Sequence, residues 1–145
     1  SHLLILRSLG KFYGLAGARV GLGIFGSEAL AQSVREALGP WPLTTPSVHV
    51  ATLALADKAW AAATRENLAA VAERTRVAFQ EAGIPIVGQT DLFTLIRCDG
   101  ETSFLALARE HVLVRSFRYD PQWIRIGVIP TRETLQRICG AVVRD

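Results

Sequence analysis

The sequence predicts an α/β protein in two parts joined by one long helix. Short apolar runs bounded by Gly or polar residues alternate with stretches of helical periodicity, which indicates mixed strands and helices. Residues 57–82 contain neither Gly nor Pro and place apolar residues on one face, which predicts a helix about 40 Å long. After Gly83, short apolar strands return around two further helices. We therefore predict a boundary near residue 77, with the end of a larger α/β domain and the long helix at 1–77 and a small α+β domain at 78–145.

The first part is expected to hold two strands and two helices around a Gly-rich loop. Ser27 is a good N-cap for the first helix, and Gly39 followed by Pro40 is a strong stop signal. Turn-forming residues separate this helix from the next. The expected strands are 3–6 and 19–25, the loop is 7–17, and the expected helices are 27–38 and 47–55.

The second part is expected to form one sheet of its own. Its strands are predicted at 84–87, 92–98, 112–117 and 123–128, and its helices at 103–111 and 131–143, with both helices on one face. Alternation along the last strand places Trp123, Arg125 and Gly127 on one side. The β-branched residues between them form the natural core side.

Composition excludes several classes of protein. Half of the 145 residues are apolar and a fifth are charged, which excludes a disordered chain. No apolar run is long enough to span a membrane. The 16 basic residues against 13 acidic ones are scattered singly, so nucleic acid is a disfavoured partner. No signal peptide is recognisable, and we expect a cytoplasmic protein with no membrane partner.

The sequence contains no Met, which leads us to expect a piece of a longer protein. The high apolar fraction fits this expectation, because part of the surface would then be covered by the missing portion or by a partner.

Three other features favour structural interpretations. Residues 21–26 match G-x-G-x-x-G, but residues 37–56 lack the acidic residue that a dinucleotide site needs, so close strand packing is favoured. The histidines lack companions at ligand spacing, so no metal site is predicted. The cysteines are expected to be packed as small apolar residues. These five residues are His2, His49, His111, Cys98 and Cys139.

The segment 7–21 carries the most chemistry. Ser8 and Lys11 are three residues apart, and Arg19 follows after a Gly-rich return. A hydroxyl, backbone amides and a guanidinium suit a phosphate group, and a lysine beside them can form an imine with an aldehyde. Pyridoxal phosphate carries both a phosphate and an aldehyde. From the residues alone, a solvated loop lysine with a surface arginine is an equally good interpretation.

The same segment resembles a known family. Ser-x-x-Lys followed by Gly-Leu-x-Gly-x-Arg-x-Gly is similar to the lysine segment of the class I/II aminotransferases, which are fold-type I pyridoxal-phosphate enzymes. The resemblance extends to Pro42–Pro46 before an Ala-rich helix, to the long helix at 57–82, and to the segments 112–117 and 123–128. It therefore spans the whole chain and implies the C-terminal part of a pyridoxal-phosphate-dependent transferase fold.

The resemblance implies roles for particular residues. Lys11 matches the Schiff-base lysine, and Ser8 and Arg19 match ligands of the cofactor phosphate. Arg125 matches the arginine that binds the substrate α-carboxylate, and Arg115 matches a second arginine near the substrate. For Arg125, the alternative is an edge-strand arginine paired with a surface acid. The implied cofactor is pyridoxal 5′-phosphate, and the implied partners are an amino-acid-like small molecule and a second copy of the chain.

Within the family, the Gly-Pro-Trp-Pro turn and the helix start at 57–60 look closest to the threonine-phosphate decarboxylases of cobalamin biosynthesis. The histidinol-phosphate aminotransferases are the second choice. The family places its acid for the pyridine nitrogen before the lysine, so we expect the 145-residue piece alone to be inactive. A stable folded piece without catalysis of its own is the alternative from a different class.

Overall fold

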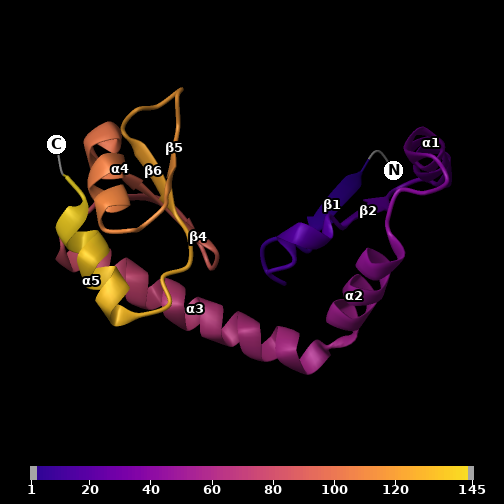
Figure 1. The fold of residues 1–145 in the computed structure, drawn as a ribbon, viewed down its shortest axis with the longest axis horizontal. Helices are drawn as coiled ribbons and strands as arrows, with labels where there is room; N and C mark the ends of the chain where they lie inside the picture. Colours follow the sequence, from indigo (N-terminus) through magenta and orange to yellow (C-terminus); the bar gives the residue numbers. More distant parts are fainter. Residues whose placement is uncertain (1–2, 144–145) are drawn as a thin grey trace. The chain divides into compact units, whose positions relative to one another are not determined.

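The computed structural model describes residues 3–143, and the chain divides into two compact units, Ser1–Ala59 and Trp60–Asp145 (Figure 1). His2, considered above as a metal ligand, lies outside the described residues. None of the described helices is long and apolar enough to cross a membrane.

The first unit is built on an antiparallel pair of strands. Its elements are β1 (Leu4–Ser8), the short 3-10 helix η1 (Ala16–Ala18), β2 (Gly21–Phe25), α1 (Glu28–Leu38) and α2 (Thr45–Ala56). The Ser27 hydroxyl accepts a hydrogen bond from the Leu30 amide at 3.3 Å, so the predicted cap of α1 is confirmed. A small core forms around Leu9, Val20 and Ala51.

Three boundaries of the first unit differ from those predicted. β1 continues to Ser8, because Arg7 and Ser8 pair with Leu22 and Gly21 of β2. β2 begins at Gly21 rather than at residue 19. α2 begins at Thr45 rather than 47, because Thr44 is the cap and the following proline fits the first helical turn.

The second unit is a four-stranded antiparallel sheet with helices packed against it. Its elements are α3 (Lys58–Glu81), β3 (Ile86–Thr90), β4 (Phe93–Arg97), α4 (Gly100–Arg109), β5 (Arg115–Ser116), β6 (Trp123–Ile126) and α5 (Arg132–Ala141). The strand order is β3-β4-β6-β5, separate from the β1–β2 pair, which confirms the single sheet expected. Its core draws residues from all three helices and from the strands: Phe79, Ile96, Leu107, Ile124, Ile126, Leu135 and Ile138.

Three elements of the second unit differ most from their predicted bounds. The strand predicted at 84–87 is β3, which spans Ile86–Thr90. α4 begins at Gly100, three residues early, because Asp99 is its cap and accepts from the Thr102 amide at 3.1 Å. The Thr102 hydroxyl also donates to Asp99, and these bonds hold the pKa of this carboxyl below its ordinary value. The strand predicted at 112–117 shortens to Arg115–Ser116, because only these two residues pair with β6.

The two compact units divide between Ala59 and Trp60, within the first turn of α3. The boundary predicted near residue 77 lies further along the same helix. Phe79 of α3 is fully buried in the core of the second unit, and Val71 and Thr75 on the same face of the helix are also buried. The apolar face of the long helix therefore assigns it, from Trp60 onward, to the second unit.

Gly100 is the tightest backbone position of this unit. A Cβ built there would lie 2.1 Å from the Pro121 carbonyl oxygen, and the Gly100 amide donates to that oxygen at 3.0 Å. Gly100→Ala is expected to lower the free energy of unfolding by about 1–3 kcal/mol, because the backbone must move apart. Urea denaturation measures this. Gly140→Ala is the control, since a Cβ there meets nothing within 4 Å and should be neutral or stabilising. Equal stability of Gly100→Ala and the unchanged chain would contradict the close contact.

Candidate functional site

Ser8, Lys11 and Arg19 line one cavity of about 250 Å³ in the first unit. Ser8 ends β1 directly opposite Gly21 of β2, so the hairpin returns Arg19 to the neighbourhood of Ser8. Gly10 lies between them, and a Cβ there would approach the Ser8 hydroxyl oxygen to 3.3 Å. The structure therefore brings together the three residues that the sequence singled out, around a space that a bulkier residue at position 10 would narrow.

The loop that carries Lys11 is held at both ends by the small core. Leu9, which is 1% exposed, donates its amide to the Val20 carbonyl at 3.3 Å and accepts from the Leu15 amide at 3.0 Å. The Gly14 amide closes a turn onto the Lys11 carbonyl at 3.0 Å, and Gly14 has a φ of +68° that suits glycine. The lysine thus lies on a short, hydrogen-bonded loop whose side chains at 8, 11 and 19 are exposed at the cavity.

The donors at this cavity suit an anion. The Ser8 hydroxyl accepts from the Gly10 amide at 3.0 Å, which leaves its own hydrogen available to a ligand. Arg19 has a φ of +54°, and its Nη1 donates to the Ala16 carbonyl at 3.4 Å. That leaves most of the guanidinium fork free for a phosphate. A phosphate with an aldehyde nearby fits this donor set, with Lys11 as the amine.

The second group of predicted residues lies on the sheet of the second unit. Arg115 of β5 and Arg125 of β6 are directly paired across the two strands, so both side chains project from the same face. On the opposite face, Ile124 and Ile126 are buried, which confirms the alternation predicted for this strand. Within residues 3–143, neither guanidinium has a carboxylate partner. Two like charges side by side repel each other, and an anion between them would remove that cost.

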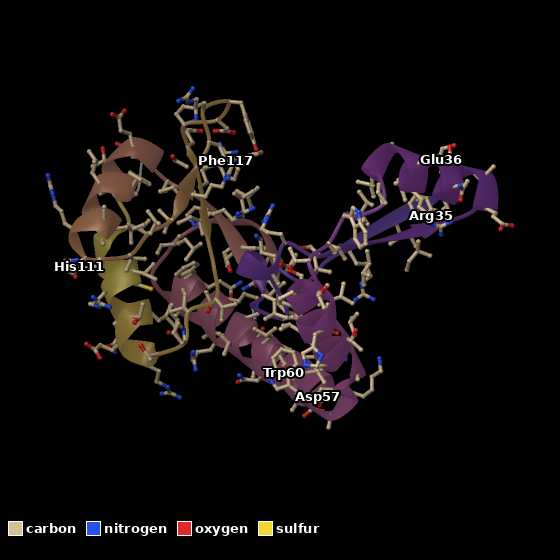
Figure 2. All side chains as sticks on the ribbon, turned by 45° about the vertical axis from the view of Figure 1, so that its right-hand side comes forward. Arg35, Glu36, Asp57, Trp60, His111 and Phe117 are labelled. Atoms are coloured by element: carbon tan, nitrogen blue, oxygen red, sulfur yellow. The ribbon has the colours of Figure 1, made fainter. Side chains whose placement is uncertain are left out.

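Aromatic side chains surround this pair. The Arg125 guanidinium carbon lies 4.3 Å from the centre of the Phe93 ring, and that of Arg115 lies 5.9 Å from the Phe117 ring. Phe117, labelled in Figure 2, directly follows β5. Tyr119 packs between Phe117 and Trp123, with ring centres 5.3 Å and 6.2 Å away. Stacking of this kind holds a guanidinium in place while leaving its edges free for hydrogen bonds.

Sequence reasoning missed the contribution of Phe93. This residue begins β4, which is far from Arg125 along the chain and next to it in the sheet. Leu95 lies directly opposite Arg125 in the sheet. Phe93, two residues before Leu95, therefore projects from the same face as Arg125. An aromatic residue at the start of an alternating strand was the available signal, but only the register assigns it to Arg125.

The two cysteines and the G-x-G-x-x-G segment contribute to packing. Cys98 is 1% exposed within the core, and Cys139 packs against that core from α5. Residues 21–25 of the G-x-G-x-x-G segment form β2, where a Cβ at Gly23 would come within 2.7 Å of the Phe25 ring. The glycine therefore permits close packing, as expected.

Comparison with known proteins agrees with these features. The family model "Aminotransferase class I and II" matches residues 1–142. The fold and the matched residues define an enzyme class that depends on pyridoxal 5′-phosphate. The chain belongs to the class I and II aminotransferase family.

Curated relatives fall into two kinds. A threonine-phosphate decarboxylase of Pseudomonas aeruginosa is 36% identical over 144 residues, which are 97% of this chain and 42% of that protein. A second one, from Sinorhizobium sp, is 33% identical over 150 residues, 99% of this chain and 42% of that protein. A histidinol-phosphate aminotransferase of Xanthomonas campestris pv. campestris is 35% identical over 151 residues, 99% of this chain and 41% of that protein. The chain thus spans less than half the length of these relatives.

Solved structures share the fold. The histidinol-phosphate aminotransferase from Clostridium acetobutylicum superposes with a TM-score of 0.83 at 20% identity, covering 96% of this chain and 44% of that one. The enzyme of the same name from Sinorhizobium meliloti, in complex with pyridoxal-5′-phosphate, gives 0.74 at 22% identity, covering 95% and 39%. These matches confirm the predicted fold class, an incomplete pyridoxal-phosphate-dependent transferase fold.

Proposed function

We propose that this chain is the C-terminal portion of a pyridoxal-phosphate-dependent enzyme that acts on a phosphorylated amino acid or amino alcohol. The first candidate for its activity is that of an L-threonine-O-3-phosphate decarboxylase. The observation that carries the proposal is the cavity at which Ser8, Lys11 and Arg19 converge, in a chain that matches the family over its length. The 36% and 33% identities to threonine-phosphate decarboxylases support the substrate class.

In this proposal, Arg19 and Ser8 bind the cofactor phosphate, and Lys11 supplies the amine that holds the cofactor. When bound, pyridoxal phosphate supplies an electron sink that stabilises negative charge at the substrate Cα. Arg125 binds the substrate carboxylate with its planar fork, and Arg115 adds positive charge beside it. Phe93 and Trp123 flank Arg125 and limit the access of water to it.

The surface of the first unit supports the view that further chain belongs with it. Leu6 of β1 is 75% exposed and Ile24 of β2 is 55% exposed. Several of their neighbours in both strands are also exposed and apolar. A sheet with apolar residues on both faces is typical of strands covered on both sides. We propose that the rest of the cofactor-binding domain covers this hairpin, and that the complete enzyme is a homodimer in the cytoplasm.

A histidinol-phosphate-type aminotransferase is the second candidate, favoured by the 35% identity to the Xanthomonas enzyme. One experiment separates the two. The complete enzyme, loaded with pyridoxal phosphate, is incubated with L-threonine O-3-phosphate, and with histidinol phosphate plus 2-oxoglutarate. Release of CO₂ with formation of 1-aminopropan-2-yl phosphate supports the decarboxylase. Formation of glutamate from the second mixture supports the aminotransferase. A separate mixture of pyridoxal phosphate with the 145-residue chain tests the third alternative, because absence of cofactor absorbance there would support a folded piece without catalysis of its own.

Arg19 gives a direct test of cofactor binding. Arg19→Ala is expected to weaken the affinity of the complete enzyme for pyridoxal phosphate about tenfold to a hundredfold, because a charge-assisted hydrogen-bond pair is worth roughly 1.5–3 kcal/mol. Fluorescence titration of the apoenzyme with cofactor measures the change. Arg7→Ala is the matched control, since Arg7 is exposed in β1 and does not line this cavity. Unchanged affinity in Arg19→Ala would refute the assignment.

A further inference from the structure

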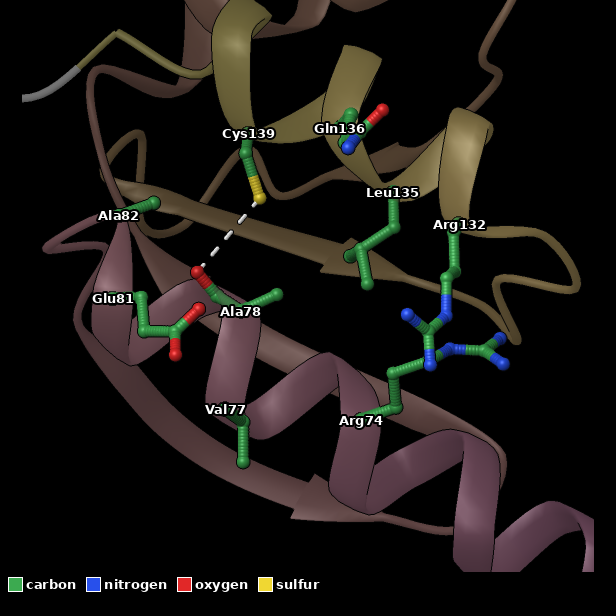
Figure 3. A pocket seen from close by; sticks show the side chains of 9 residues that line it. All are labelled: Arg74, Val77, Ala78, Glu81, Ala82, Arg132, Leu135, Gln136 and Cys139. Atoms are coloured by element: carbon green, nitrogen blue, oxygen red, sulfur yellow. Dashed lines mark hydrogen bonds between the residues drawn. The ribbon is translucent and has the colours of Figure 1, made fainter.

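A second cavity, of about 650 Å³, lies between α3 and α5 in the second unit (Figure 3). Arg74 and Arg132 line it together with apolar residues, among them Val77, Leu135 and the side chain of Cys139. Neither the cofactor phosphate nor the substrate carboxylate is assigned to any of these residues. The proposed binding of cofactor and substrate therefore does not account for this cavity.

The two arginines bring positive charge to one end of the cavity. Figure 3 shows both guanidinium groups pointing into the same region, one from α3 and one from the start of α5. Within residues 3–143, neither forms an ion pair with a carboxylate, and the Arg132 guanidinium has no hydrogen-bond partner. Two neighbouring guanidinium groups without a counter-charge repel each other, so a bound anion would stabilise this arrangement.

The Arg74 guanidinium is anchored by hydrogen bonds at one nitrogen, while another of its nitrogens has no acceptor among the described residues. Its Nη2 donates to the carbonyls of Ile129 and Pro130 at 2.8 Å and 3.1 Å, which anchors the guanidinium against the segment before α5. Its Nε is buried and has no acceptor among the described residues. Buried donors without a partner are uncommon in native structures, and each calls for an explanation. A neighbouring anion would offset the cost, because the charge is shared over the whole guanidinium.

The rest of the cavity restricts the kind of anion. Val77 and Leu135 form apolar walls beside the arginines. Glu81 lies two helical turns further along α3 and carries the opposite charge. An anionic head is therefore favoured only at the arginine end, with an apolar body along the walls. A free inorganic ion would use the head position alone.

We propose that this cavity binds a small organic anion, with a carboxylate or phosphate head at Arg74 and Arg132 and an apolar body against Val77 and Leu135. The proposal does not depend on the catalytic function proposed above. A ligand there would link α3 to α5, and hence stabilise the second unit in proportion to its affinity.

Cys139 provides a readout inside the cavity. Its Sγ lies 4.0 Å from the Ala78 carbonyl oxygen on the opposite wall, and its side chain is half-buried (Figure 3). In the complete enzyme loaded with pyridoxal phosphate, the rate of Cys139 alkylation by iodoacetamide is measured by peptide mass mapping. Cys98, which is 1% exposed, serves as the internal report that the protein stays folded.

The probes are butyl phosphate, butyrate, inorganic phosphate and butanol. Either butyl anion is expected to slow Cys139 alkylation several-fold at millimolar concentration, while butanol does not. The butyl anion that protects Cys139 more strongly identifies the preferred head group. Equal protection by inorganic phosphate would show that the site binds only a free ion, and would overturn the proposal of an organic ligand.

The Arg132 variants test the head-group position. Arg132→Gln and Arg132→Glu should remove the protection. Arg109→Gln, an exposed arginine of α4 outside the cavity, should retain it. Absence of protection by both butyl anions, or protection that survives both Arg132 variants, would overturn the proposal.

Discussion

Replacing Lys11 with Ala is expected to abolish turnover of the complete enzyme, with a loss of about 10³-fold or more, together with the visible absorbance of the lysine-bound cofactor. The reason is chemical: the cavity at Ser8 and Arg19 can still hold a phosphate, but the amine that forms the covalent link is gone. Absorbance spectra and steady-state rates measure the two effects. Cofactor retained through the phosphate contacts alone would show the spectrum of a free aldehyde.

The sequence offers a matched control, because Lys58 is the other lysine of the chain. It is exposed at the start of α3, and Lys58→Ala removes the same charge without touching the cavity. Borohydride reduction followed by peptide mapping adds a direct assignment, since the cofactor should be fixed on Lys11. A Lys11→Ala enzyme that keeps the lysine-bound absorbance would disprove the role.

Arg125→Ala is expected to raise KM for an amino-acid substrate about tenfold to a hundredfold, in line with roughly 1.5–3 kcal/mol for a charge-assisted bidentate pair. Cofactor affinity should stay nearly unchanged, because the proposed cofactor ligands belong to the first unit. Arg125→Lys should recover little, since a point charge cannot form two parallel hydrogen bonds or keep the stacking on Phe93 at 4.3 Å.

Arg118→Ala is the control for this effect, because Arg118 is exposed in the segment between β5 and β6 and outside the paired strands. Steady-state kinetics over a full range of substrate concentration separate KM from kcat. If Arg125→Ala saturates normally, the carboxylate is bound elsewhere, and Arg115, its cross-strand partner, becomes the next residue to replace.

Local patterns were sufficient for much of this protein. Ser27 and Gly39 delimit α1, and Thr131 caps α5, because capping depends on residues within one helical turn. The alternation at 123–126 correctly separated the buried isoleucines from Arg125, since side chains of a strand alternate by geometry alone. The lysine segment could also be recognised, because its spacing of Ser8, Lys11 and Arg19 is short enough to be a local property.

Features that depend on contacts between residues far apart in the sequence were decided only by the tertiary structure. The pairing of Arg115 with Arg125, and the position of Phe93 beside them, follow from strand register, which is fixed by hydrogen bonding and burial across the sheet. The shortness of β5 follows from how few residues find partners on β6. The place of α3 in the second unit follows from the burial of Phe79 in a core built by later elements. The cavity of Arg74 and Arg132 forms only when α3 and α5 pack together, and no local pattern in either helix encodes that contact.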